Sequence, residues 1–153
     1  MILYLDASAL VKRYVAEPGT LEVGEIIAEA EVVGTSTISR AETAAALAKA
    51  VRVGTLVREA AASALQVFRS EWMNLVRVQP TELLIARADS LAWELELRGY
   101  DAVHLASAML WREGMGREVT VATFDQQLWE AAIQLGLVPF PDDLPGTLAS
   151  WQR

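Results

Sequence analysis

Short apolar runs alternate along the chain with longer stretches in which apolar residues recur at helical spacing. The short runs predict buried strands, because they are apolar or β-branched over a few positions and are bounded by polar or turn-forming residues. They are residues 2–5 (ILYL), 31–36 (EVVGTS), 74–79 (NLVRVQ), 119–123 (VTVAT) and 137–140 (LVPF). The last run predicts only a short strand, because Pro139 has no backbone N–H to donate to the hydrogen-bond ladder of a sheet.

The stretches between these runs predict helices. A short helix over residues 7–15 ends before Pro18 and Gly19, and the other helices cover residues 21–30, 39–54, 56–72, 81–98, the apolar segment from 101, and 125–136. Residues 141–153 are rich in turn formers, and we expect them to pack loosely.

Strands separated by helices are typical of a parallel sheet covered on both faces. We therefore predict an α/β fold, a three-layer α/β/α sandwich with a central, mostly parallel sheet, as a single domain over residues 1–153.

Composition narrows the class of protein. Hydrophobic residues make up 53% of the chain and charged residues 22%, which excludes a disordered chain. There is no cysteine, so any metal must be held by oxygen atoms or by the single histidine, His104. The first apolar run ends at Asp6 and is too short for a signal peptide or a membrane span, so we expect a soluble, cytoplasmic protein with no membrane partner. A net charge of −7 means that binding to nucleic acid would need a local basic rim.

Acidic residues stand where predicted elements meet. Asp6 follows the first strand, Asp125 follows the fourth, and Asp101 opens the most apolar helix. In parallel α/β sheets ligands bind outside the carboxyl ends of the strands. If the first and fourth strands are neighbours, Asp6 and Asp125 share one crevice.

Each of these acids also has a purely structural explanation. Asp6 and Asp101 have the residue type of helix N-caps, and Asp125 suits the first turn of a helix, where the dipole favours an acid. Glu42 stands three residues after Ser39, which is the spacing of a capping box. Each explanation accounts for one acid, but none accounts for the occurrence of Asp6, Glu42, Asp101 and Asp125 together at such positions.

The set, taken in order along the chain, resembles the PIN domain, and more narrowly the VapC-type ribonuclease toxins of bacterial and archaeal toxin–antitoxin pairs. The resemblance extends from Met1 to about Phe140. The residues that carry it are Asp6-Ala7-Ser8, Glu42, Tyr100-Asp101-Ala102 and Thr123-Phe124-Asp125.

The resemblance implies a metal-dependent endoribonuclease in which Asp6, Glu42, Asp101 and Asp125 converge as the catalytic acids. Asp6, Asp101 and Asp125 would be ligands of Mg²⁺ or Mn²⁺, and Glu42 would orient or activate the attacking water. Physical chemistry agrees, because neighbouring carboxylates raise one another's pKa values and hard divalent cations relieve the repulsion. Gln126 and Gln127 follow Asp125 where many relatives carry a further acid or asparagine, which weakens the case for a second metal ion.

The substrate-binding side chains are less clearly marked. Ser8 and Thr123 could hydrogen-bond a carboxylate or an RNA phosphate, or serve only as first-turn residues. Arg40 is the basic candidate for a phosphate contact, whereas surface charge is the favoured interpretation of Lys12 and Arg13. The basic residues near the acids in sequence are Lys12, Arg13, Arg40 and Arg98.

His104 lies one helical turn after Asp101 and could reach the acids, although a lone histidine in so apolar a helix is more often a core residue. The resemblance also implies two protein partners, a second copy in a homodimer and a small antitoxin that places a basic side chain among the acids. The alanine-rich helix over residues 39–54 could let a partner helix approach closely, although alanine is also simply the best helix former.

Other functions fit less well. A haloacid-dehalogenase-type enzyme would carry a second acid at position 8, which is a serine, and a receiver module would carry a late lysine, although no lysine follows Lys49. A catalytically silent PIN-like module that binds RNA or a protein partner remains the alternative.

Overall fold

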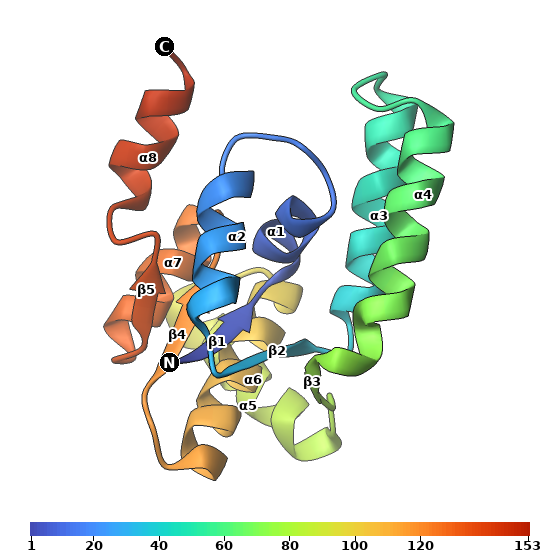
Figure 1. Cartoon of the computed structure of the whole chain (residues 1–153). Coiled ribbons are helices and arrows are strands. Elements are labelled where there is room, and N and C mark those ends of the chain that lie inside the picture. The colour runs from blue at the N-terminus through green and yellow to red at the C-terminus, as the bar shows by residue number, and fades with distance from the viewer.

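The computed structural model describes residues 1–153, and its helices enclose a five-stranded sheet (Figure 1). The strands are β1 (Ile2–Leu5), β2 (Val32–Ser36), β3 (Val76–Val78), β4 (Val119–Ala122) and β5 (Val138–Phe140). The helices are α1 (Ala7–Leu10), α2 (Thr20–Glu29), α3 (Ser39–Arg52), α4 (Arg58–Glu71), α5 (Glu82–Leu95), α6 (Gly99–Met115), α7 (Gln126–Gln134) and α8 (Leu144–Trp151), with 3-10 turns at Val11–Arg13 and Trp72–Asn74.

All strand pairs in the sheet are parallel, and the strand order is β3-β2-β1-β4-β5. The predicted fold class is therefore confirmed. β1 lies at the centre between β2 and β4, and its last residue, Leu5, pairs with Ala122 of β4. The residues that follow these two strands, Asp6 and Thr123, consequently emerge side by side at the carboxyl edge of the sheet.

The central strand is buried on both faces, as its continuous apolar run predicts. Ile2 and Tyr4 pack into a core formed with α5, α6, α7 and β4. Leu3 and Leu5 pack into a second core on the opposite face, with α1, α2 and α4. Alternate side chains of one strand thus join the two outer layers to the sheet.

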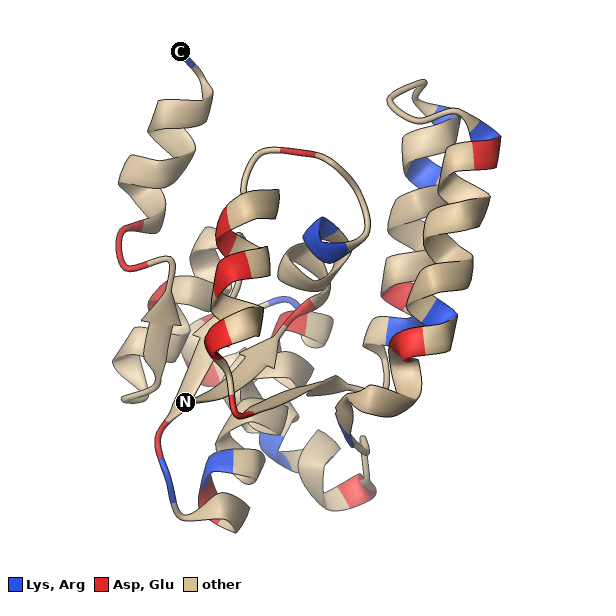
Figure 2. Cartoon of the chain, in the orientation of Figure 1, with Lys and Arg blue, Asp and Glu red and all other residues tan.

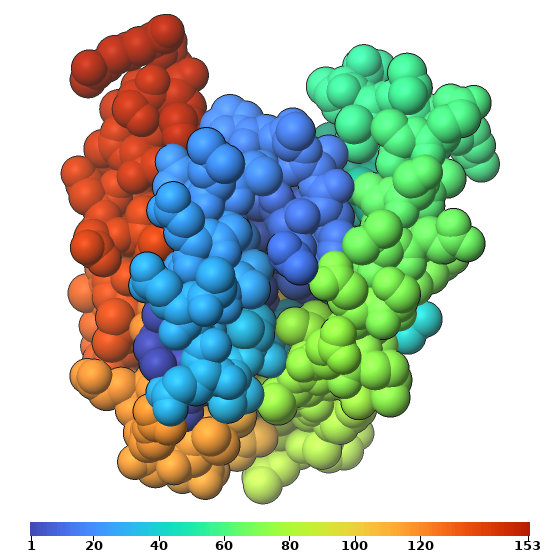
Figure 3. All heavy atoms as spheres, in the orientation of Figure 1, coloured from blue at the N-terminus to red at the C-terminus, as the bar shows by residue number.

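Helices α3 and α4 form a hairpin beside the sheet (Figure 1). The space-filling view shows the tip of this hairpin separated from the remainder of the molecule by an open gap (Figure 3). No helix in the structure combines the length and the apolar character needed to cross a membrane.

The C-terminal residues do not pack loosely, and that expectation was wrong. Leu144 of α8 is fully buried, and the Trp151 ring stacks on Phe124 with 5.4 Å between ring centroids. The surface-charge interpretation of Lys12 was also wrong: its ammonium lies 4.6 Å from the Phe124 ring and 5.0 Å from the Trp151 ring and donates to the Pro18 carbonyl. Sequence reasoning missed both features because each depends on partners far away in the chain.

We expect Gly34 of β2 to be required for the packing of α6 on the sheet. A Cβ atom at this position would lie 2.6 Å from the Trp111 ring, so Gly34→Ala should lower the free energy of unfolding by about 1–3 kcal/mol in urea titrations. Gly24→Ala in α2 is the matched control, because nothing lies within 4 Å of its Cβ position and alanine should be neutral or stabilising there. Equal stability of the two variants would contradict this packing.

Candidate active site

Asp6 is held at the carboxyl end of β1 by three donors. Its Oδ1 accepts from the Ala9 backbone N–H at 3.0 Å and from the Ser8 hydroxyl at 2.7 Å, and its Oδ2 accepts from the Thr123 hydroxyl at 2.6 Å. The first of these bonds makes Asp6 the N-cap of α1, so the structural interpretation holds for this residue. The residue is nonetheless only 3% exposed, which is an unusual environment for a carboxylate.

Burial raises the pKa of Asp6 above its ordinary value, and the nearby His104 and the three hydrogen bonds offset part of this effect. Ser8 and Thr123 also connect the two strand ends. The Ser8 hydroxyl accepts from the Phe124 N–H at 2.9 Å, and the Thr123 hydroxyl accepts from the Asp125 N–H at 3.1 Å. Both hydroxyls therefore orient the carboxylate of Asp6; contact with substrate stays a prediction.

Asp101 and Asp125 share one cation, the guanidinium of Arg98. Arg98 Nε donates to Asp101 Oδ2 at 2.9 Å, and Nη2 donates to Asp125 Oδ2. The pKa of Asp101 is raised by its burial first and then by the neighbouring charge of Asp125, with a smaller contribution from Asp6, while Arg98 opposes the shift. Asp6, Asp101 and Asp125 thus belong to one electrostatic cluster.

The capping roles expected of the later acids were partly wrong. Asp101 is not an N-cap; it lies in the first turn of α6, whose N-cap is Arg98. Asp125 is itself the N-cap of α7, because its Oδ1 accepts from the Leu128 N–H at 3.0 Å.

Glu42 forms no capping box. Ser39 is already inside α3, and its hydroxyl bonds with the Thr35 hydroxyl at 2.6 Å, so that interpretation was wrong. The carboxylate of Glu42 instead lies 2.7 Å from Nε2 of His104. Glu42 is therefore joined to the acids through α6, the helix that carries both His104 and Asp101, rather than by direct contact.

The donor set suits a hard divalent cation, although the side chains as placed do not form a metal cage. No three acidic or histidine side chains stand close enough together to hold a metal ion. The groups available are carboxylate and hydroxyl oxygens, which are the ligands that Mg²⁺ and Mn²⁺ prefer. The Arg98 guanidinium lies between Asp101 and Asp125 and marks the position where positive charge is stabilised.

The remaining basic candidates point elsewhere. Arg40 is exposed and lies over the Trp72 ring, 5.7 Å from its centroid, with no ion pair to the acids. Arg13 pairs with Glu71 on the surface. Sequence reasoning grouped Arg98 with these residues. The signal for its actual position was its place three residues before Asp101, because the side chains of an N-cap residue and of the third helical residue can reach each other.

We expect Asp6→Asn to raise the stability of the metal-free protein at neutral pH. A carboxyl group with a raised folded-state pKa contributes its full stability below the unfolded pKa, near 4, and that stability is lost as the pH rises towards the folded pKa. Asparagine retains an acceptor for the Ala9 N–H but carries no charge. In EDTA the melting temperature should rise at pH 7, by about 2–4 °C for each kcal/mol gained, and match wild type near pH 4.

The exposed Asp89 on α5 provides the matched control, because Asp89→Asn removes one charge without changing a buried site. If Asp6→Asn melted below wild type at pH 7 in EDTA, the charge of Asp6 would be stabilising and this account of its burial would be wrong.

Comparison with known proteins shows the family to which the chain belongs. The family model described as the PIN domain matches residues 3–134. Ribonuclease VapC45 of Mycobacterium tuberculosis is 32% identical over 144 residues, which cover 94% of this chain and 97% of that protein.

Solved structures share the fold. PAE2754 from Pyrobaculum aerophilum aligns with a TM-score of 0.63 and 21% identity, over 97% of this chain and 90% of that one. A toxin–antitoxin complex from Klebsiella pneumoniae aligns with a TM-score of 0.58 and 17% identity, over 82% of this chain and 87% of that one. The match of the family model over most of the chain, together with the identity to a curated ribonuclease, shows that this chain belongs to the PIN domain family.

Proposed function

We propose that this chain is a Mg²⁺- or Mn²⁺-dependent endoribonuclease and acts as the toxin of a VapBC-type toxin–antitoxin pair. The observation that carries the proposal is the cluster of Asp6, Asp101 and Asp125 at the carboxyl edge of β1 and β4. Two of these carboxylates have pKa values raised by burial, so the site stabilises added positive charge. The similarity to proteins named ribonuclease VapC supports RNA as the substrate.

The chain's own residues have separable tasks in this proposal. Asp6, Asp101 and Asp125 hold the metal, and Ser8 and Thr123 fix the orientation of Asp6. Glu42 accepts the proton of the attacking water, and Arg40 contacts an RNA phosphate from the exposed start of α3. A bound divalent cation would neutralise charge on the scissile phosphate and make a bound water more acidic.

Cleavage of a mixed pool of structured RNAs tests the activity. With Mn²⁺ or Mg²⁺ the protein should cut the RNA, and with EDTA it should not. Asp6→Asn and Asp101→Asn should each lower the rate by roughly 100-fold or more, because each removes a charged oxygen ligand. The exposed Asp89→Asn variant should cleave as wild type does.

Melting curves give a second readout that does not require turnover. Metal at about 100 times its Kd should stabilise the wild-type protein by about 2.7 kcal/mol, which is about 5–10 °C, and the effect should shrink in Asp6→Asn. Cleavage that continued in EDTA, or normal cleavage by both aspartate variants, would refute the metal site.

The silent binding module is favoured by one observation, the neutralisation of Asp101 and Asp125 by Arg98 within the chain. Metal-dependent stabilisation without any cleavage would support that alternative.

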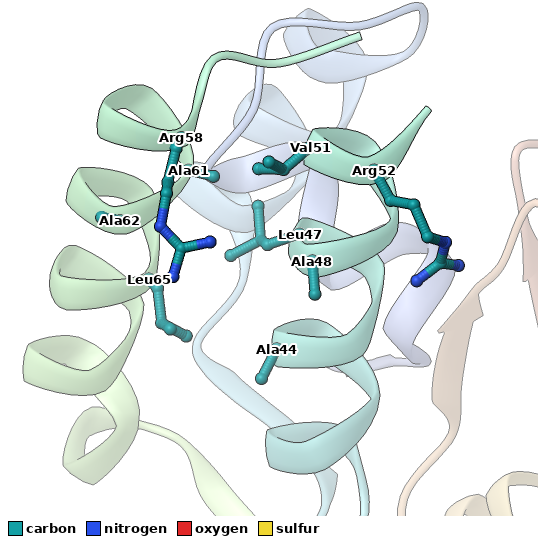
Figure 4. Close-up of a pocket in the computed structure, with 9 residues that line it drawn as sticks. All are labelled: Ala44, Leu47, Ala48, Val51, Arg52, Arg58, Ala61, Ala62 and Leu65. Atoms are coloured by element: carbon teal, nitrogen blue, oxygen red, sulfur yellow. The ribbon is translucent and has the colours of Figure 1, made fainter. Parts of the chain in front are cut away.

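The hairpin of α3 and α4 offers a surface for the antitoxin. Between the two helices lies an apolar groove of about 400 Å³ (Figure 4). Basic residues flank it, and they gather near the hairpin tip, where Figure 2 shows bands of blue. We propose that an antitoxin helix fills this groove with apolar side chains and pairs acids with Arg52 and Arg58. The lining residues are Ala44, Leu47, Ala48, Val51, Arg52, Arg58, Ala61, Ala62 and Leu65.

A steric block tests this docking site. Ala48 lies in the groove and is exposed, so Ala48→Arg should fill the groove without disturbing the core and should abolish co-purification with a co-expressed VapB-type antitoxin. Ala45→Arg is the matched control on an exposed position of α3 outside the groove. Unchanged co-purification by Ala48→Arg would place the antitoxin elsewhere.

A homodimer is the second partnership that we propose. Helix α5 presents Leu83 and Trp93 to solvent, 81% and 88% exposed. Aromatic side chains such as tryptophan are enriched at protein interfaces.

A further inference from the structure

A buried chain of three side chains connects the centre of the sheet with the hairpin. Tyr4 of β1 is fully buried, and its hydroxyl lies 2.7 Å from Nδ1 of His104. His104 of α6 is 2% exposed, and its Nε2 lies 2.7 Å from Oε1 of Glu42 on α3. The imidazole therefore uses both of its nitrogens, one toward the core and one toward a candidate catalytic acid.

The direction of these hydrogen bonds follows from the chemistry of the partners. A tyrosine hydroxyl carries its proton at neutral pH, because its ordinary pKa is about 10, and it can therefore donate to Nδ1 of His104. A neutral imidazole accepts a hydrogen bond from that hydroxyl at Nδ1 and must then carry its own hydrogen on Nε2. Nε2–H is thereby aimed at Glu42, which can only accept while it is ionised.

We infer that His104 is a positioning residue, which Tyr4 orients and which fixes the carboxylate of Glu42 relative to the other acids. Glu42 is half-buried, and His104 is its hydrogen-bonding partner. His104 stands one helical turn from Asp101 on α6. Its hydrogen bond to Glu42 therefore connects the α3–α4 hairpin to the helix that carries Asp101. The inference rests on the proposed function, because Glu42 has a catalytic task only if the chain cleaves RNA.

A histidine with a purely structural role, in which the contacts only satisfy its own ring nitrogens, would show the same hydrogen bonds in the structure. The two roles differ in what they do to catalysis. Loss of a positioning contact lowers kcat, since Glu42 leaves its productive geometry, whereas a structural role changes stability alone.

The hydrogen on Nε2 can be observed without any activity. Since His104 is the only histidine, a long-range ¹H–¹⁵N spectrum at pH 8 gives a single imidazole pattern. We expect Nε2 to be protonated in the wild-type protein and its preference over Nδ1 to weaken in Tyr4→Phe. An unprotonated Nε2 would overturn the inference, even if the protein cleaved RNA.

Cleavage kinetics with Mn²⁺ test the consequence for Glu42. His104→Leu should lower kcat by about 10- to 100-fold with little change in KM. His104→Gln, whose side-chain amide can donate to Glu42, should retain more activity than His104→Leu. Met109→Ala, a core change on the same helix, is the control for lost stability and should keep the wild-type kcat.

A double variant separates this inference from the function on which it rests. Combining His104→Leu with Glu42→Gln should be no slower than Glu42→Gln alone, because both changes remove the same contribution. Fully additive losses, or wild-type kcat in His104→Leu, would overturn the positioning role while leaving the nuclease intact. Wild-type protein that cleaves nothing would refute the proposed function, and the Nε2 spectrum would still decide whether the contact exists.

Discussion

Two carboxylates lie almost fully buried at the carboxyl edge of the sheet, and much of the surrounding structure compensates for their burial. Removing a carboxylate from water is costly unless hydrogen bonds or opposite charges replace the lost hydration. Asp6 receives three hydrogen bonds from α1 and from the end of β4. Asp101 receives the guanidinium of Arg98, which it shares with Asp125. The junctions of β1 with α1 and of β4 with α7 are therefore fixed to each other by polar contacts.

This compensation is incomplete, and that bears on the proposed chemistry. The pKa values of Asp6 and Asp101 remain above their ordinary values despite these partners. In the proposed function, a divalent cation, or a basic side chain of another protein, would offset the part of this burial cost that Arg98 leaves uncompensated. The same electrostatics would thus serve both metal binding and inhibition by an antitoxin.

Helix α3 takes part in two of the proposed tasks. Its first turn carries Glu42, held by His104, and the following turns line the apolar groove between α3 and α4. In the proposal, a partner that occupied the groove would press on the helix that positions Glu42. The contact of Glu42 with His104 is the one direct side-chain link between this hairpin and α6 that involves a candidate catalytic acid.

Much of the fold was predictable, because apolar periodicity reports which positions face a core. The buried run of β1, the strand at residues 119–122 and the apolar helix after Asp101 were all located from their sequence patterns. Helix α8 was missed, since its stability depends on Leu144 being buried and on Trp151 stacking against Phe124. Lys12 was misassigned for a similar reason, as the aromatic rings around it come from the far end of the chain.

The sequence by itself determined the layered α/β architecture and the acids that stand at its strand and helix ends. Both follow from local information, the spacing of apolar residues and the residue type at each boundary. Only the tertiary structure decided that Arg98 neutralises Asp101 and Asp125, and that His104 joins Tyr4 to Glu42. The Tyr4–His104 contact joins residues 100 positions apart, and the His104–Glu42 contact joins residues 62 positions apart. No local pattern encodes which side chains a folded sheet brings within hydrogen-bonding distance.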